Sequence, residues 1–201
     1  MKLKKVVSIC NKSKVFRLFD KVGESGEIEQ WLGDGSAIYR LNGLPILDED
    51  SLCAVFDISE KQLKTTLVWQ SAMPGEINAG DTDPAERQIK DDDFFIIYGG
   101  TEMQPLKTRN GIIFIQRKYL SPLEDVAEMV RLYERSTPEG QTYIVAKVGL
   151  LIAALIFPYN AVKEKFVNLL EEITRECRRT LNAPKVYRIE CGDDQGEVSK
   201  E

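Results

Sequence analysis

The chain has 201 residues, of which 43% are hydrophobic and 29% charged, and its formal net charge is -5. These values are ordinary for a globular protein with its own core, and the negative charge disfavours a protein that coats nucleic acid. Histidine is absent, and the four cysteines, at positions 10, 53, 177 and 191, form no C-x-x-C pair. The commonest general base is therefore excluded, as are histidine-activated nucleophiles, and a zinc site is disfavoured.

The amino terminus is basic, with seven Lys/Arg in residues 1–21 against the single Asp20. It has neither the apolar region nor the small-residue cleavage site of a signal peptide, so we expect a cytoplasmic protein with reduced thiols. The longest apolar run, residues 148–157, is half of what a bilayer requires, so we expect no membrane partner.

The first 41 residues predict a small antiparallel meander. Residues 6–10 and 15–19 are β-prone runs that we interpret as a hairpin. Residues 27–31 and 37–41 follow as two further strands, because Gly33 and Gly35 between them tolerate the positive φ of a tight turn.

Residues 48–69 predict two short helices. Asp48 can cap the first helix, which we expect to run through Phe56, and Ser59 opens a capping box for a second helix that reaches about Trp69. This spacing is that of a DNA-binding helix-turn-helix. The candidate DNA contacts on its second helix are the following residues: Lys61, Gln62, Lys64 and Thr65.

Two features weaken the helix-turn-helix interpretation. Asp57 stands where the turn usually has glycine, and the acidic residues of segment 48–50 lie nearby, where a phosphate-binding surface disfavours them. Helix pairs with this spacing also occur as plain elements of a core, so both interpretations remain open.

Residues 71–93 are acidic and contain glycine and proline, but they lack the EF-hand pattern, so we expect a solvated or mobile loop rather than a calcium site. Residues 94–98 then predict a buried strand. Residues 104–108 and 112–116 predict a hairpin, because Asn110-Gly111 between them is a strong turn signal.

The last third of the chain predicts helices. Ser121 begins a capping box with Pro122 at the first helical position, so we expect a helix to about residue 135. Residues 143–157 are too uniformly apolar for periodicity to decide between helix and strand, and their place between two helices favours helix. A final helix to about residue 181 shows apolar residues at helical spacing, and we expect the centre of the fold at residues 142–181, where this helix and the preceding apolar run bury their faces. Its apolar face comprises Val162, Phe166, Leu169, Leu170, Ile173 and Cys177.

The sequence therefore predicts an α+β fold, in which an amino-terminal antiparallel β-sheet of hairpins precedes a carboxy-terminal layer of about three helices. We expect a single domain over residues 1–182, with a possible subdivision into 1–70 and 94–182. Residues 186–189 form a possible strand within a polar tail, residues 183–201.

Three stretches resemble an uncharacterised family of proteins from bacterial prophages. They are GDGSAIYRLNGLPILDEDSLCAVFDIS at residues 33–59, KYLSPL at 118–123 and GLLIAALIFPY at 149–159. The resemblance covers most of the chain and implies a phage or mobile-element setting in the host cytoplasm. It implies no activity and no site residue.

No catalytic constellation is visible in the sequence. Gly99-Gly100-Thr101 lacks the P-loop pattern, Gly33 and Gly35 lack the third glycine of a dinucleotide-binding turn, and a lone cysteine without histidine is a poor nucleophile. We therefore expect no enzyme, no cofactor and no metal, but a protein that binds another protein as an assembly factor, inhibitor or regulator of a host factor. The alternative is a regulator that binds duplex DNA through residues 48–69.

Overall fold

A computed structural model describes residues 1–23, 25–90 and 94–183 of the chain. It divides into two compact units, Met1–Ala161 and Val162–Glu201. The predicted strand at residues 186–189 and the polar tail lie outside the described residues. Among the described helices, none combines the length and the apolar character needed to cross a membrane.

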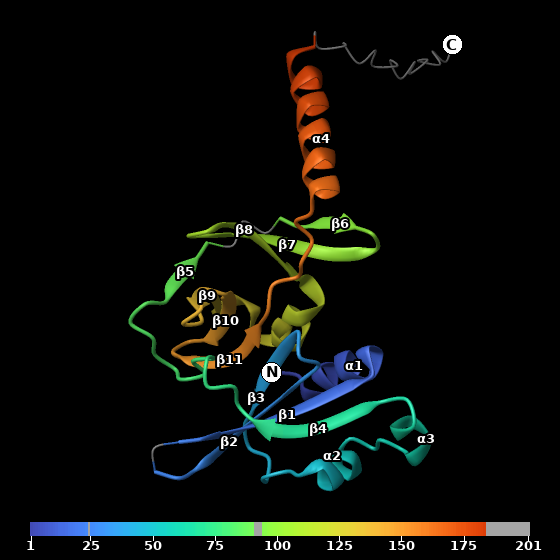
Figure 1. The fold of residues 1–201 in the computed structure, drawn as a ribbon, viewed down its shortest axis with the longest axis vertical. Helices are drawn as coiled ribbons and strands as arrows, with labels where there is room; N and C mark the ends of the chain where they lie inside the picture. Colours follow the sequence, from blue (N-terminus) through green and yellow to red (C-terminus); the bar gives the residue numbers. More distant parts are fainter. Residues whose placement is uncertain (24, 91–93, 184–201) are drawn as a thin grey trace, which may run out of the picture. The chain divides into compact units, whose positions relative to one another are not determined.

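The first unit is built on an eight-stranded sheet with strand order β4-β1-β2-β3-β11-β10-β9-β5 (Figure 1). One half of the sheet contains β1 (Val15–Val22), β2 (Ile28–Gly33), β3 (Ala37–Leu41) and β4 (Leu67–Ala72). The other half contains β5 (Arg87–Ile89), β9 (Val130–Ser136), β10 (Thr142–Val148) and β11 (Leu151–Ile156). The halves meet where β3 pairs antiparallel with β11, with Tyr39 opposite Ala154.

The two halves share one arrangement, a helix followed by three antiparallel strands. Helix α1 (Leu3–Ser13) precedes β1, β2 and β3, and the 3-10 segment η1 (Arg117–Met129) precedes β9, β10 and β11. In each half a further strand borders the first strand of the meander: β4 runs parallel to β1, and β5 runs antiparallel to β9. The edges of the sheet are therefore β4 and β5.

The amino-terminal hairpin predicted at residues 6–10 and 15–19 is wrong in its first strand, because residues 6–10 belong to α1. The buried residues Val6, Ile9 and Cys10 follow helical spacing and form one face of this helix. The left-handed conformation of Lys14 ends α1. The strands predicted at 27–31 and 37–41 are confirmed as β2 and β3.

The apolar run was predicted to be a helix, and this prediction is wrong. It forms the hairpin of β10 and β11. These strands lie inside the sheet and both of its faces are covered, so their side chains are apolar on both sides and show no period-two alternation. Gly149, with φ +63°, lies in the turn between the two strands. Periodicity therefore could not distinguish a doubly buried strand from a buried helix.

Segment 121–135 is also corrected. The structure has η1 to Met129 and then strand β9, where a single helix to residue 135 was predicted. The predicted hairpin around Asn110-Gly111 is confirmed as β7 (Thr101–Thr108) and β8 (Gly111–Gln116). They form a separate three-stranded sheet with β6 (Ile96–Tyr98), whose residues are half-buried or exposed rather than buried as predicted.

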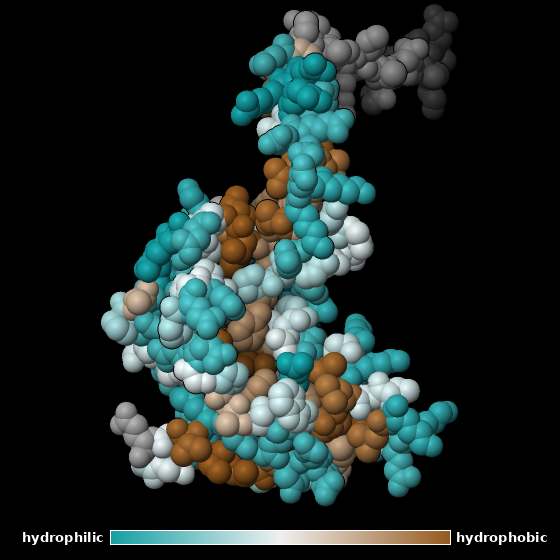
Figure 2. All heavy atoms as spheres, viewed as in Figure 1, coloured by the Kyte–Doolittle hydropathy of each residue, from teal (hydrophilic) through white to brown (hydrophobic). Residues whose placement is uncertain are grey.

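In the second unit the structure describes one long helix, α4 (Glu164–Asn182). The face of α4 that is turned to the viewer in Figure 2 is mainly hydrophilic. Its predicted apolar face includes Leu169 and Ile173, which are 40% and 50% exposed. The prediction that this helix forms the centre of the fold is therefore wrong, since the buried residues concentrate in the first unit.

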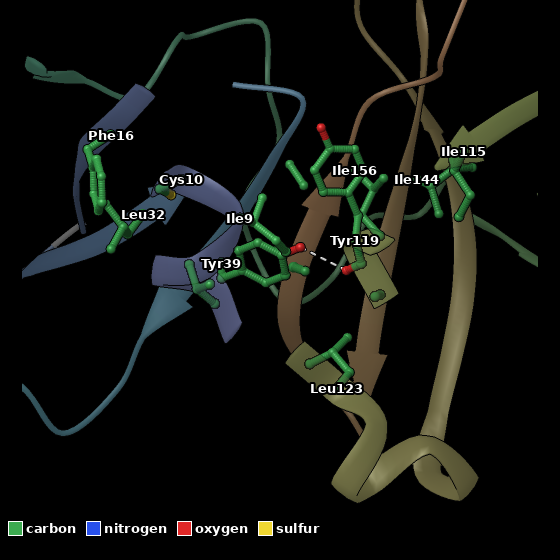
Figure 3. Close-up of a cluster of buried hydrophobic side chains, with 14 of the residues drawn as sticks. Ile9, Cys10, Phe16, Leu32, Tyr39, Ile115, Tyr119, Leu123, Ile144 and Ile156 are labelled. Carbon is green, nitrogen blue, oxygen red and sulfur yellow. Dashed lines mark hydrogen bonds between the residues drawn. The ribbon is translucent and has the colours of Figure 1, made fainter. Parts of the chain in front are cut away.

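The large sheet has a hydrophobic cluster on each face. On the first face, α1 and η1 pack against the sheet, and the hydroxyl of Tyr39 on β3 donates to the carbonyl oxygen of Tyr119 on η1 at 2.8 Å (Figure 3). On the second face, the cluster includes Phe19, Trp31 and Leu155. The fold is thus α+β as predicted, but with an eight-stranded sheet, and the described residues contain about five helices instead of three.

Candidate functional site

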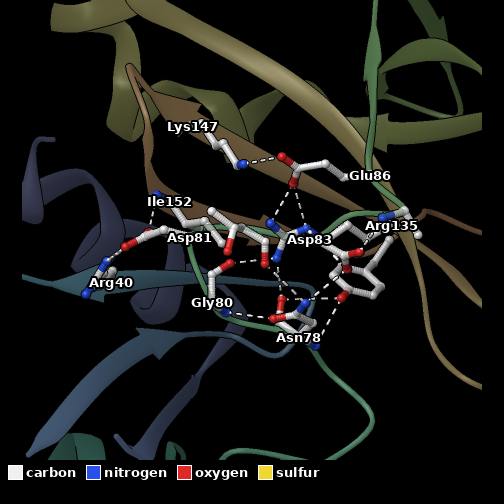
Figure 4. A network of polar contacts seen from close by, with 12 residues as sticks. Arg40, Asn78, Gly80, Asp81, Asp83, Glu86, Arg135, Lys147 and Ile152 are labelled. Carbon is white, nitrogen blue, oxygen red and sulfur yellow. Dashed lines mark hydrogen bonds and ion pairs between the residues drawn. The ribbon is translucent and has the colours of Figure 1, made fainter. Parts of the chain in front are cut away.

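The second face of the sheet is covered by the chain between β4 and β5, which contains most of the predicted acidic loop. Buried ion pairs hold this segment in place. The guanidinium of Arg135, whose side chain is fully buried, donates to Glu86 at 2.5 Å and to the carbonyl oxygens of Asn78 and Gly80 at 2.8 Å each (Figure 4). The ammonium of Lys147 pairs with the same carboxylate. The expectation of a solvated or mobile loop does not describe residues 77–89.

A second set of contacts fixes the same segment at β2, β3 and β11. Asp81 accepts hydrogen bonds from Arg40 at 3.1 Å and from the backbone N–H of Ile152 at 2.8 Å, and Arg40 also pairs with Glu29. Burial raises the pKa of Asp81, but the hydrogen bonds from Ile152 and Arg40 outweigh it and leave the pKa below its ordinary value. The carboxylate is therefore held in its charged form.

A mostly apolar hollow of about 390 Å³ lies on this face, between the sheet and the start of the covering segment. Its apolar walls come from the following side chains: Phe19, Ile38, Met73, Ile77, Tyr143 and Phe157. The hydroxyl of Tyr143 accepts a hydrogen bond from the backbone N–H of Asn78 at 3.0 Å. The covering segment is thereby tied to one wall of the hollow.

Arg17 of β1 lines the hollow, and its guanidinium has no carboxylate partner. Its Nε is buried without a hydrogen-bond partner among the described residues. Such an unsatisfied donor costs about 1–3 kcal/mol. By contrast, Arg40 and Arg135 on the same face of the sheet both pair with carboxylates. Among the described residues on this face, Arg17 is therefore an arginine without an ion pair to a carboxylate.

Two neighbours define the position of the Arg17 side chain. Its Cζ lies 5.4 Å from the ring centroid of Trp69, which is opposite Arg17 on the edge strand β4. On another side, a Cβ added to Gly35 would stand only 3.1 Å from an Nη atom of Arg17. The absent side chain and the positive φ of Gly35, +88°, leave the space that the guanidinium needs.

A second hollow, of about 540 Å³, lies beside β9 and η1. Lys90, Arg117 and Arg131 line it, together with Glu124 and Glu128. The guanidinium of Arg131 donates to the carbonyl oxygens of Glu128 and Val130, and Arg117 stacks over Phe95 at 4.3 Å. Its arginines thus already have contacts, and two carboxylates share its lining.

The helix-turn-helix predicted at residues 48–69 is wrong in its second helix. Asp48 and Ser59 form the predicted capping boxes, and α2 (Glu49–Val55) is present, but α3 (Glu60–Leu63) has only four residues. The chain then continues into β4, which satisfies its backbone by pairing with β1. A one-turn helix is shorter than the recognition helix that enters a major groove.

The candidate DNA contacts therefore lie on and just after a single turn. All four side chains, those of Lys61, Gln62, Lys64 and Thr65, belong to exposed residues. The amide oxygen of Gln62 is occupied, because it accepts from the backbone N–H and the hydroxyl of Ser59 at 2.9 Å each. These residues are neighbours in the sequence, but the described structure has no longer helix there whose face could carry them into a DNA groove.

The three cysteines that the structure describes show no activated thiol. Burial raises the pKa of Cys10 to about 12, and burial together with nearby carboxylates also raises the pKa of Cys53. Cys177 is exposed on α4. Within the described ranges, no three His, Cys, Asp or Glu side chains gather as they would around a metal ion.

Sequence reasoning missed Arg17 as a functional residue. The sequence indicated only a strand at 15–19 with alternating character, which places Arg17 and Phe19 on one face. Whether the guanidinium finds a partner depends on residues 33–35, 69 and 73–77, which other parts of the chain bring there. No family model, curated protein or solved structure matches the sequence.

Proposed function

We propose that the protein acts without catalysis by binding another protein, and that α4 is the element that docks. The observation that carries this proposal is the apolar stripe of α4. Leu169, Leu170 and Ile173 recur along it at helical spacing, and Cys177 continues it by a further turn. Within the described part of its unit, α4 is the only helix, and a single helix cannot bury its own stripe.

The charges of α4 differ between its two halves, which favours a partner helix that runs antiparallel. Acidic residues dominate the first half of α4, with Glu164, Glu171 and Glu172, and Arg175, Arg178 and Arg179 dominate the second half. The exceptions are Lys165 and Glu176. A helix with the same pattern, including a second copy, would place opposite charges side by side in the antiparallel direction and like charges in the parallel direction.

The absence of activated groups in the described structure supports a non-catalytic role. The thiols of Cys10 and Cys53 are held in the protonated form by their surroundings, and the half-buried carboxylates of Glu86 and Asp81 are engaged in ion pairs. Following the resemblance to prophage-encoded proteins, we propose a host cytoplasm as the setting, where the protein would act as an assembly factor, inhibitor or regulator of a host factor.

A matched pair of double variants tests the docking role of α4. Leu169→Ser with Ile173→Ser disrupts the stripe, and Asn168→Ser with Asn182→Ser places two serines on the opposite face without changing a charge. The tagged protein is purified from native cells, bound protein and nucleic acid are identified together, and the mass is measured by sedimentation. We expect the stripe variant alone to lose its partner.

The outcomes of this experiment separate the possible partners. A dimer that dissociates only in the stripe variant identifies a second copy, and a captured protein lost only in that variant identifies a different partner. Capture that survives the stripe variant, or is lost equally in both variants, would contradict docking through α4. A wild-type protein that is monomeric and carries no bound protein would also contradict docking through α4.

Duplex DNA is the competing ligand, and a separate binding experiment tests it. Any binding through the turn at residues 59–65 would depend on Lys61 and Lys64, and it would weaken steeply as salt rises because counterions are released. We expect no duplex binding at low salt. A salt-sensitive shift of duplex DNA that disappears in Lys61→Ala with Lys64→Ala would replace protein binding with DNA binding as the function.

A further inference from the structure

We propose that the hollow beside Arg17 is a binding site for a small molecule that carries one carboxylate on an apolar body. This proposal concerns the first unit alone and does not depend on the docking role of α4.

The first argument is the missing counter-charge of Arg17. On the second face of the sheet, Arg40 pairs with Glu29 and Asp81, and Arg135 pairs with Glu86. The guanidinium of Arg17 lies over the ring of Trp69 and close to Gly35, and it forms no ion pair with a carboxylate of the described residues. A planar guanidinium binds a carboxylate through two parallel hydrogen bonds, so a carboxylate ligand would supply the partner that the chain does not.

The second argument is the shape and lining of the hollow. Its volume, about 390 Å³, lies in the range of cavities that hold small ligands. Phe19, Ile38 and Tyr143 are buried residues that form its floor, and Met73 and Phe157 add apolar surface. An apolar body can therefore fill the hollow while one charged group reaches Arg17 at its boundary.

The third argument concerns the number of charges on the ligand. Glu76 also lines the hollow, without an ion pair to any described residue, and it is exposed. Its carboxylate would repel a second acidic group on the ligand. The remaining polar lining consists of the uncharged side chains of Thr137, Gln141 and Thr142. The site therefore fits a monocarboxylate better than a dicarboxylate or a phosphate.

The test compares 3-phenylpropionate with 3-phenylpropionamide, which has the same body without the charge. Trp69 reports binding by its fluorescence because its ring lies against the Arg17 guanidinium, and Trp69→Phe separates its signal from that of Trp31. Binding is also measured as a rise in Tm. We expect the acid to bind with a Kd of about 1 mM or tighter. The amide should bind about 10-fold more weakly or worse.

Two arginine variants assign the charge preference to one residue. Arg17→Met keeps the length of the side chain and removes its charge, and it should abolish the preference for the acid over the amide. Arg131→Met makes the same change at the second hollow and should leave the preference intact. Arg17→Lys should retain part of the preference, since a lysine keeps the charge but not the paired donors.

Several results would overturn the proposal. They are an amide that binds the wild-type protein as tightly as the acid, equal loss of the preference in Arg17→Met and Arg131→Met, and no saturable change with the acid up to about 10 mM. The comparison of acid with amide on the wild-type protein needs no variant, so it decides the matter even if Arg17→Met fails to fold.

Discussion

Nε of Arg135 on β9 donates to Oε2 of Glu86 at 2.9 Å, and this buried ion pair ties the second face of the sheet to the segment that covers it. Lys147 on β10 pairs with the other oxygen of the same carboxylate. One carboxylate thus neutralises two buried cations that project from neighbouring strands. The covering segment supplies part of the wall of the hollow beside Arg17. We therefore expect Glu86, which anchors this segment, to help maintain the shape of the hollow.

Glu86→Gln should destabilise the protein strongly. The substitution keeps a hydrogen-bond acceptor but leaves Lys147 buried without its counter-charge, and it leaves Arg135 only the longer ion pair with Asp83, at 3.8 Å. Breaking such a buried pair costs about 3 kcal/mol or more. The measurement is the free energy of unfolding from urea titrations. The control is Glu139→Gln, which removes an equal charge from an exposed residue without an ion pair among the described residues. Equal stability of the two variants would contradict the role given to Glu86.

The same ion pair predicts a dependence of stability on pH. Burial raises the pKa of Glu86, but hydrogen bonds from Lys147 and Arg135 outweigh it, so the pKa lies below its ordinary value of 4.5. A carboxyl group whose pKa is lower in the folded state stabilises the protein above its unfolded pKa. This stabilisation is lost as the pH falls through the folded pKa. We expect the free energy of unfolding to decrease below about pH 4.5, and less steeply in Glu86→Gln.

A pair of leucines in the β10–β11 hairpin tests where the core lies. Leu155 is fully buried, and Leu150, in the turn of the same hairpin, is 86% exposed. Leu155→Ala should cost about 2–5 kcal/mol of unfolding free energy, because it leaves a cavity between packed side chains. Leu150→Ala should change it by about 0.5 kcal/mol or less. Similar losses in the two variants would show that β11 is not a central strand.

The cysteines should differ in reactivity in the folded protein. Cys177 is exposed, and Cys10 is buried with its pKa raised to about 12, so a thiol reagent at neutral pH should modify Cys177 first and Cys10 only after unfolding. Peptide mass spectrometry identifies the modified residue, and Cys177→Ser should remove the fast phase. Rapid modification of Cys10 in the folded state would contradict its burial on the inner face of α1.

Denaturation without reductant tests the expected redox state. If the thiols are reduced, as the sequence led us to expect, all four cysteines should then react. Two blocked thiols in protein taken from intact cytosol would contradict that expectation, because disulfides are rare there.

The local signals that the sequence predicted correctly are those that a few adjacent residues determine. The side chain of Asp48 accepts from the backbone N–H of Ser51 at 2.8 Å, and Asn110-Gly111 joins β7 to β8. Capping and tight turns depend on side-chain chemistry within three or four positions, so they can be recognised without knowledge of the fold. Ser59 was recognised for the same reason, although its helix ends after one turn.

The errors arose where contacts with distant parts of the chain determine the secondary structure of a segment. Residues 143–157 became strands because β9, β3 and the two covering layers satisfy their backbone and side chains on all sides. Residues 67–69, predicted as the end of the second helix, belong to the edge strand β4, because parallel pairing with β1 outweighs the continuation of a short helix. Pairing of this kind leaves little trace in the local pattern of residues.

By itself the sequence determined the α+β class, the caps at Asp48 and Ser59, the Asn-Gly hairpin, strands β2 and β3, and the amphipathic character of α4, because these follow from local chemistry and periodicity. Only the tertiary structure decided that β3 pairs with β11 to make one eight-stranded sheet, and that an acidic segment neutralises Arg40, Arg135 and Lys147 but not Arg17. The physical reason is that a charged side chain is available to bind a ligand only where the fold places no opposite charge beside it. The groups that could neutralise it come from strands and segments far apart in the sequence.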